Sequence, residues 1–254
     1  MVAVCTARRI ARSIASSVCK KPMSSTTGQN YQVRGFSDSN YFAGTNALVG
    51  KLGTVRMVFK LLSLPGSGQY VIFGRCDNTG SSGGWYLCTS FITANKLVLQ
   101  HRNSVGGYIL SDGYVLNASD IGSLFVIHAT ASDNDFTHFY LGGMEVGTPV
   151  ATNTLLTART NDLAYIGRYQ WNTGFSTSAF GIIDLAVSSS VMTPQQVYKD
   201  AYEIMASVSQ LTISDIPSQS DRFKADSLVS ATNWVSTDSS LTLTRNGSLT
   251  VDQF

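Results

Sequence analysis

Glutamate is nearly absent from this sequence, and its scarcity bears directly on catalysis. Charged residues make up only 13% of the chain, and its two glutamates, Glu145 and Glu203, are far apart in the sequence. Glycosidases place two carboxylates about 5 to 9.5 Å apart, and on a strand this needs closely spaced acidic residues. The glycines at 80, 83 and 84 lie between two expected strands rather than before a helix, so they form no phosphate-binding loop. The sequence therefore predicts a protein that is not an enzyme and uses no cofactor.

Long apolar runs are also missing. No stretch approaches the roughly 18 apolar residues that a membrane-spanning helix requires. The first apolar stretch is interrupted by Arg8, Arg9 and Arg12, so it lacks the apolar centre of a secretory signal. We therefore expect no membrane span and no export by the general secretory route.

Acidic residues are missing from the N-terminal region. Residues 1–37 carry six of the 18 basic side chains and no acidic one, which leaves twelve basic against 16 acidic residues in the remainder. An apolar row at four-residue spacing (Ile10, Ile14, Val18) predicts an amphipathic helix within residues 1–30. A basic arm on a mildly acidic body is typical of partner binding.

Three interpretations of this arm remain open: a mitochondrial presequence, an assembly arm that binds another subunit, or a solvated tail. The assembly arm is favoured, and nucleic acid is a less fitting partner because aromatic residues do not alternate with the basic ones. The residues expected to bind the partner subunit are Arg8, Arg9, Arg12, Ile10, Ile14, Lys20 and Lys21.

Cysteine and histidine are too few and too scattered for a metal site. Cys76 and Cys88 flank a Gly/Ser-rich loop, where two paired strands would bring them side by side. Free, half-buried thiols are the favoured state in a reducing compartment, and a disulfide stays open as the alternative. The four cysteines lack zinc-site spacing, and the three histidines are not near them in the sequence. We expect no metal.

What the body does contain is short strands joined by polar turns. In residues 54–62, Val55, Met57 and Phe59 alternate with polar residues, which predicts a half-buried strand. Comparable segments at 70–74 and 85–88 predict a hairpin, and those at 108–110 and 114–116 another around Ser-Asp-Gly. This pattern predicts one β domain over residues 31–208, between the arm (1–30) and an extension (209–254).

One helix is predicted near the end of this domain. Thr193 is a helix N-cap, Pro194 occupies the first helical position, and Gln196 completes a capping box. Apolar residues then recur at helical spacing as far as Val208, which predicts an apolar stripe packed on the strands.

Several segments together resemble the laminin-G-like domains of the concanavalin A-like lectin jelly-roll superfamily. The residues that carry the resemblance are Leu124–Thr130, Ser132–Asp135, His138–Gly143, Ile166-Gly167, Phe180-Gly-Ile-Ile-Asp184 and Met192–Gln196. It is good over residues 122–205 and looser over 31–121. The implied fold is all-β, a two-sheet antiparallel jelly-roll sandwich with one short C-terminal helix and extensions at both ends. Such domains bind or act as scaffolds, and some are glycosidases.

The resemblance also implies roles for single residues. Asp184, Gly181 and Thr193 are expected to be structural, with the Asp184 carboxylate held by backbone groups or a nearby basic residue. A calcium ligand is the less favoured role for Asp184. This chain has Gly142-Gly143 where the family has Asp-Gly, which argues against a family-type metal contact at that turn.

Two tryptophans are candidates for sugar binding. The segment Tyr169, Gln170, Trp171, Asn172 combines aromatic rings that stack on pyranose faces with amides that form hydrogen bonds. Trp85, beside two glycines, is a second candidate. Packing over the rim of the sandwich is the favoured alternative for both.

The extension ends in a predicted hairpin. Residues 241–251 form two alternating segments around Asn246-Gly247, a strong hairpin signal. Because an isolated hairpin is marginally stable, we expect it to pair with a sheet of this domain or of a neighbour.

The function favoured by this combination is that of a non-enzymatic component of a large assembly. We predict a phage or viral virion protein, of the capsid-decoration or fibre-base type, located in the virion and made in the host cytoplasm. The alternatives are a carbohydrate-binding lectin module, which would be extracellular and bind a glycan, and a mitochondrial accessory protein with a basic leader. The predicted partners are other protein subunits.

Overall fold

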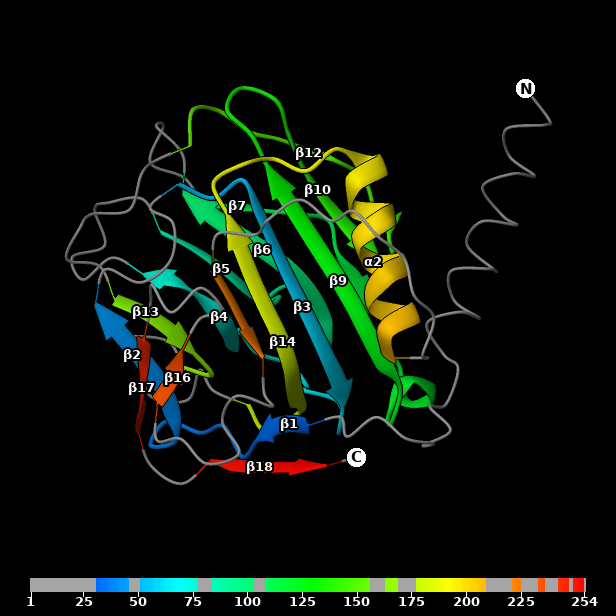
Figure 1. The fold of residues 1–254 in the computed structure, drawn as a ribbon. Helices are drawn as coiled ribbons and strands as arrows, with labels where there is room; N and C mark the ends of the chain where they lie inside the picture. The colour runs from blue at the N-terminus through cyan, green and yellow to red at the C-terminus, as the bar shows by residue number, and fades with distance from the viewer. Residues whose placement is uncertain are drawn as a thin grey trace.

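The computed structural model is a sandwich of two antiparallel β-sheets with one long helix on an outer face (Figure 1). It describes residues 31–45, 51–76, 84–102, 108–155, 163–168, 177–208, 221–224, 233–235, 242–246 and 249–253. The helices among these residues are α2 (Pro194–Val208) and the short 3-10 helix η1 (Ala118–Asp120). The predicted fold class, a two-sheet jelly-roll sandwich with one C-terminal helix, is confirmed.

Each sheet has nine strands among the described residues. Sheet I runs β11-β10-β9-β3-β14-β1-β18, with β12 on β10 and β15 on β14. Its strands are β1 (Tyr31–Arg34), β3 (Thr54–Leu61), β9 (Leu124–Ala131), β10 (Phe136–Leu141), β11 (Met144–Glu145), β12 (Val150–Ala151), β14 (Phe180–Ser188), β15 (Asp221–Lys224) and β18 (Thr250–Gln253).

Sheet II runs β16-β17-β2-β13-β4-β5-β6-β7, with β8 on β6. Its strands are β2 (Tyr41–Thr45), β4 (Val71–Cys76), β5 (Trp85–Thr89), β6 (Lys96–Arg102), β7 (Tyr108–Leu110), β8 (Tyr114–Val115), β13 (Leu163–Ile166), β16 (Asn233–Val235) and β17 (Thr242–Asn246).

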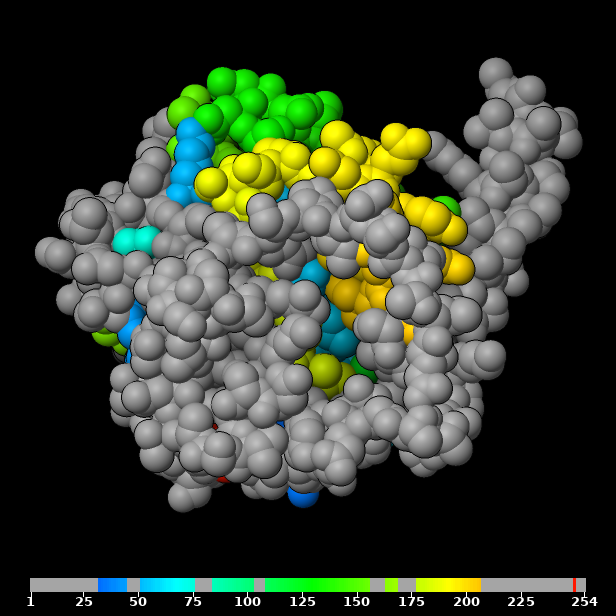
Figure 2. Space-filling view, viewed as in Figure 1, coloured from blue at the N-terminus to red at the C-terminus, as the bar shows by residue number. Residues whose placement is uncertain are grey.

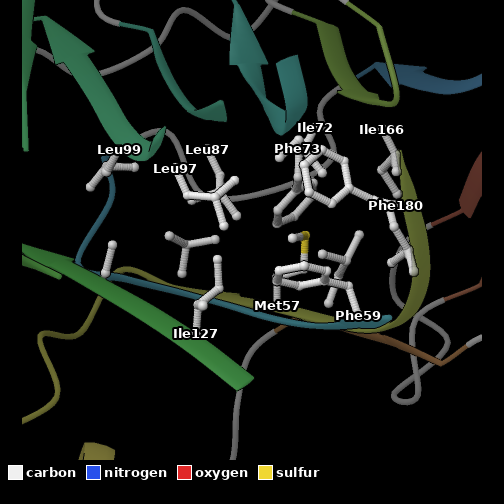
Figure 3. Close-up of a cluster of buried hydrophobic side chains, with 14 of the residues drawn as sticks. Met57, Phe59, Ile72, Phe73, Leu87, Leu97, Leu99, Ile127, Ile166 and Phe180 are labelled. Carbon is white, nitrogen blue, oxygen red and sulfur yellow. The ribbon is translucent and has the colours of Figure 1, made fainter. Parts of the chain in front are cut away.

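Apolar side chains from both sheets fill the space between them (Figure 3). Phe59 of β3 stacks on Phe125 of β9 and meets Phe180 of β14 edge to face, with ring centroids 5.1 and 5.3 Å apart. Burying each such side chain stabilises the fold by about 1.5–3 kcal/mol. A polar contact between the sheets lies within this core: His101 Nε2 of β6 is 2.7 Å from Thr137 Oγ1 of β10.

The alternation predicted for residues 54–62 is confirmed, with one difference in burial. Val55, Met57 and Phe59 face the core, as expected. The opposite face of β3 is buried too, because α2 covers it, so Arg56 and Val58 are each only 1% exposed. A strand predicted to be half-buried is therefore buried on both faces.

Helix α2 begins as the sequence predicts. The backbone N–H of Thr193 donates to Gln196 Oε1 (2.8 Å), and the Gln196 N–H donates to Thr193 Oγ1 (3.3 Å), which completes the capping box. Ala201 and Ile204 of its buried stripe contact Val58 and Val126 on the outer face of sheet I. Figure 2 shows α2 and the residues before it, in yellow to orange, at the surface of this face.

The predicted C-terminal hairpin is wrong. The strands on either side of Asn246-Gly247 do not pair with each other: β17 joins β2 in sheet II, and β18 joins β1 in sheet I. Leu249, between them, is 5% exposed and belongs to the core. The Asn-Gly signal is local, whereas both strands find longer-range partners in different sheets. The chain therefore crosses from one sheet to the other at this point.

Two further local predictions are corrected. The segments around Ser-Asp-Gly do not form a hairpin, since β7 and β8 both pair with β6. The hairpin of β4 and β5 forms as predicted, but Cys88 lies opposite Val71, near the far end of the hairpin from Cys76. Cys88 is a free, buried thiol, and burial raises its pKa to about 12, so it is a packing residue.

Candidate functional site

The outer face of sheet II carries a row of tyrosine and amide side chains. The strand register aligns Tyr165 of β13, Gly74 of β4, Tyr86 of β5, Gln100 of β6 and Leu110 of β7 across the sheet. Cross-strand partners project to the same side of a sheet, and the neighbouring residues of these strands fill the core. We call this surface, with Tyr41, Gln69, Arg102, Tyr108 and Arg168 at its margins, the tyrosine face.

A chain of hydrogen bonds fixes the centre of the tyrosine face. Gln69 Nε2 donates to Gln100 Oε1 (2.5 Å), and Gln100 Nε2 donates to the Tyr86 hydroxyl (3.1 Å). Tyr86 and Gln100 are each 4% exposed and lie beside the buried side chains of Cys88 and Val98. Because these polar groups satisfy one another, the centre is a rigid support rather than the part of the face that meets solvent.

One margin of the face exposes an arginine–tyrosine pair. Arg102 Nη2 donates to the Tyr108 hydroxyl at 2.6 Å, and its guanidinium carbon lies 4.3 Å from the Tyr108 ring centroid. Tyr108 is 44% exposed, so its ring offers a surface on which a flat ligand can stack.

The other margin has a second arginine–tyrosine pair. The guanidinium carbon of Arg168 lies 4.6 Å from the Tyr41 ring centroid. The ring centroids of Tyr41 and Tyr165 are 6.1 Å apart. Gly167 makes this arrangement possible: its φ of +83° turns the chain, and a Cβ there would collide with the Phe36 ring. After this turn, the half-buried Arg168 lies over the Tyr41 ring.

A charged pair lies at the edge of the face formed by β6 and the β7–β8 connection. Lys96 forms an ion pair with Asp112, whose other carboxylate oxygen accepts the Thr148 N–H at 2.9 Å. The hydrogen bond from Lys96 lowers the pKa of Asp112 below its ordinary value. The positive charge of Lys96 is thus offset on the face itself.

A second polar cluster lies beneath α2, on the outer face of sheet I. Arg56 donates from Nη2 to Asp184 Oδ1 (3.0 Å) and from Nη1 to Asp200 Oδ1 (3.0 Å), and His128 Nε2 lies 2.6 Å from Asp200 Oδ2. Asp184 therefore has the basic partner that the sequence predicted for it. Since Arg56, His128 and Asp200 are almost fully buried, we call this set, with Asp184, the buried ionic cluster.

The pKa values of the cluster follow from burial and charge. Burial would lower the pKa of Arg56, but the charges of Asp184 and Asp200 raise it above its ordinary value. Burial would raise the pKa of Asp200, but the hydrogen bond and charge of His128 and the charge of Arg56 lower it to about 2. Burial lowers the pKa of His128 despite its hydrogen bond to Asp200. The cluster joins α2 to β3, β9 and β14, which is a structural role.

The remaining residues predicted to be structural also lie in sheet I or at its helix. A Cβ at Gly181 would lie 2.0 Å from Gln32 Oε1 of the neighbouring strand β1, so a larger residue there would displace the Gln32 side chain. Thr193 caps α2. No group of three or more metal-ligating side chains occurs among the described residues.

The sequence-predicted sugar-binding residues are only partly described. Tyr169, Gln170, Trp171 and Asn172 lie outside the described residues, in the segment that follows Arg168 in the chain. Trp85 is 2% exposed and packs edge to face on Phe73, with centroids 5.6 Å apart, so its ring belongs to the core. Its assignment as a stacking surface is therefore corrected, and the alternative of packing fits this position.

The predicted arm cannot be located in the fold, because its residues also lie outside the described part. These are Arg8, Arg9, Arg12, Ile10, Ile14, Lys20 and Lys21. Among the described residues, no helix is long and apolar enough to cross a membrane.

The two glutamates do not meet on the tyrosine face. Glu145 of β11 hydrogen-bonds through Oε1 to His138 Nδ1 (2.6 Å) at the edge of sheet I. Glu203 of α2 is 6% exposed, and no described residue donates a hydrogen bond to its carboxylate. The two carboxylates belong to different elements on the side of the sandwich opposite the tyrosine face.

No protein-family model matches this sequence, and no curated protein matches it. Among solved structures, one similar chain is described as a "putative carbohydrate binding protein" from Bacteroides ovatus, with 13% identity and a TM-score of 0.60. The alignment covers 89% of this chain and 60% of that one, so this chain corresponds to little more than half of that protein. A native heptameric SAP-like pentraxin from Limulus polyphemus is 14% identical, with a TM-score of 0.49, over 93% of this chain and 96% of that chain. The fold is the concanavalin A-like lectin jelly-roll sandwich that the sequence resembles.

Proposed function

We propose that this protein binds a carbohydrate through the tyrosine face and catalyses no reaction on it. The observation that carries the proposal is the pairing of two tyrosine rings, the exposed Tyr108 and the half-buried Tyr41, with arginine side chains on one sheet. Tyr108 and Tyr41 lie at the two margins, each stacked with an arginine. Aromatic rings bind the apolar face of a sugar, while guanidinium and amide groups hydrogen-bond to its hydroxyls.

The fold gives independent support. The Bacteroides ovatus protein, whose printed description concerns carbohydrate binding, has the same sandwich. Fold likeness alone does not determine function, so the proposal rests on the side chains of the tyrosine face. The segment from Tyr169 to Asn172, for which the sequence predicts sugar binding, follows Arg168 directly in the sequence and lies outside the described residues.

The distribution of acidic residues supports binding without hydrolysis. Glycoside hydrolysis requires two carboxyl groups on either side of the scissile bond. Asp112, at the edge of this face, is engaged with Lys96 and Thr148. Asp38, in the turn before β2, is not without a partner either. Glu145 and Glu203 belong to sheet I and α2. Carboxylates that are already engaged do not supply a free acid and a free nucleophile.

A virion role stays a prediction of the sequence. It rested on the arm and the extension, and no described contact of the body bears on it. Sugar binding, the sequence-based alternative, has the side chains of the tyrosine face in its favour, so it is the function we propose.

The test is binding of the purified full chain to a glycan array, followed by variants at the two margins. We expect Tyr41→Ala and Tyr108→Ala each to weaken binding by about 1 kcal/mol, roughly fivefold. The matched controls are Tyr198→Ala and Tyr202→Ala, which remove tyrosines that are 52% and 42% exposed on α2. These controls should bind like the wild type.

Two results would contradict the proposal. Absence of reproducible binding to any glycan would exclude a lectin function for the chain. Binding that is lost in the α2 variants and retained in Tyr41→Ala and Tyr108→Ala would move the site to the other sheet. Trp171→Ala, with an unchanged melting temperature, tests whether the neighbouring segment contributes.

A further inference from the structure

We infer that the sugar bound by the tyrosine face carries a carboxylate, and that Arg168 is the residue that recognises it. This inference rests on the glycan-binding function proposed above and names the class of ligand. It is carried by the position of Arg168, by its lack of an acidic partner, and by the balance of charge on the face.

Arg168 has unused hydrogen-bonding capacity in a fixed position. Its guanidinium lies over the Tyr41 ring, 4.6 Å from the centroid, and forms no ion pair with any described residue. Its Nε is buried and donates to no acceptor. A guanidinium offers five N–H donors, and a buried donor without an acceptor is costly.

The planar shape of the Arg168 guanidinium favours a carboxylate as the hydrogen-bond acceptor on the ligand. A guanidinium is planar and pairs with a carboxylate through two parallel N–H···O bonds. Stacking on Tyr41 holds the guanidinium plane before the ligand arrives, so little ordering is needed when it binds. Tyr41 also packs near Tyr165, which restricts the ring itself.

The charges on the rest of the face leave it positive. Lys96 and Asp112 offset each other. Arg102 adds a second positive charge at the opposite margin, beside Tyr108. Asp38, in the turn before Tyr41, is not without a partner of its own. In a chain with only 13% charged residues, this excess of positive charge favours an anionic ligand over a neutral one.

A sugar acid fits these features better than a nucleic acid, which also pairs aromatic rings with arginine. Single-stranded nucleic acids bind along grooves lined by several cationic side chains. The body of this chain carries more acidic than basic residues after position 37, and its tyrosine face has few cations. The amides of the half-buried Gln69 and the buried Gln100 fix the geometry of the face but add no charge. A uronic acid, with one carboxylate per ring, matches a face with one unpartnered guanidinium.

The test compares ligands that differ only in the carboxylate. Titration calorimetry of the full chain would use oligogalacturonate, its methyl ester and an oligothymidylate, at low and high salt. We expect oligogalacturonate to bind at least tenfold more tightly than its ester, with the difference shrinking as salt rises. Arg168→Gln should abolish that preference, and Arg168→Lys, which keeps the charge and loses the planar fork, should retain part of it.

Arg34→Gln is the matched control, because it removes the same charge from an exposed position on β1 of sheet I. It should leave both affinities unchanged. Equal wild-type affinity for the acid and the ester would overturn the carboxylate inference while leaving sugar binding intact. Tighter binding of the oligothymidylate than of either sugar would replace it with nucleic-acid binding. Failure to bind any glycan on the array would reject the proposed function itself.

Discussion

The stability of this protein depends strongly on a few charged side chains, because the chain has few charges and several of them are buried together beneath α2. The buried ionic cluster places one guanidinium between two carboxylates, with the imidazole of His128 beside the second. Removing one member of such a set leaves the others desolvated and unpaired, which costs more than the set contributes as a whole.

Asp200→Asn tests this cost. The change removes the charge that faces both Arg56 and His128 under α2, and we expect it to lower the free energy of unfolding by about 3 kcal/mol. Urea denaturation at pH 7 measures the difference. Asp133→Asn, which breaks the exposed pair with Lys51, is the control and should cost less than about 1 kcal/mol. Equal effects of the two changes would contradict a structural role for the cluster.

The histidine between the sheets predicts a dependence of stability on pH. Burial lowers the pKa of His101 from 6.5 to about 4. Below pH 6.5 the unfolded chain takes up a proton at this imidazole, whereas the folded protein does so only near pH 4. Stability is therefore full above pH 6.5 and declines as the pH falls to 4, by as much as about 3 kcal/mol.

His101→Gln should flatten this decline while keeping a donor for Thr137. Denaturation curves at intervals from pH 7.5 to 4 measure the slope, and the part that remains is expected from His128, whose pKa burial also lowers. Parallel stability curves for variant and wild type would show that His101 does not titrate as its burial implies.

The candidate site illustrates how far single-residue reasoning reaches. Sugar binding was predicted for Trp171 from the amide residues next to it in the sequence, and for Trp85 from the two glycines that precede it. The structure buries Trp85, because its place in the alternation of β5 directs it to the core. Tyr41, Tyr165 and Arg168 were not predicted, since they meet only once β2 and β13 are paired. Their one early signal is alternation, which leaves each tyrosine on the face opposite its apolar neighbours.

At the level of elements, local signals were reliable where an element depends on its own sequence. The capping box determined the start of α2, and alternation determined the faces of β3. The Asn-Gly turn misled because pairing of β17 and β18 with β2 and β1 depends on residues far away in the sequence. The burial of the outer face of β3 under α2 could not be predicted either, because the residue pattern of a strand does not show which element packs on its outer face.

The C-terminal strands should be required for folding. Truncation after residue 208 removes β15, β16, β17 and β18, which pair in both sheets, together with the core residue Leu249. We expect the shortened chain to lack a cooperative thermal transition. In the full chain, Leu249→Ala should cost about 2–3 kcal/mol, as measured by denaturant unfolding. A truncated chain that melts like the full one would support an independent domain over residues 31–208.

On the scale of the whole molecule, we predict that the sandwich and the basic arm have separable roles. We predict that deleting residues 1–30 leaves a folded, soluble β domain, because the described core and both sheets begin at Tyr31 or later. The same deletion should abolish association with a partner subunit. Size-exclusion chromatography with light scattering and a melting curve would report the two properties. An unchanged assembly state after deletion would exclude the arm as the binding element.

The way the two ends of the described chain meet has a consequence for how the protein is made. The first two strands, β1 and β2, pair with β18 and β17, the last two. These strand pairs join residues far apart in the sequence, so their formation carries the largest loop-closure entropy cost in the fold. We therefore expect them to form late and folding to be slow. During synthesis, β1 and β2 leave the ribosome long before these partners exist. Until then their edges stay open, and a nascent chain released early is vulnerable to aggregation.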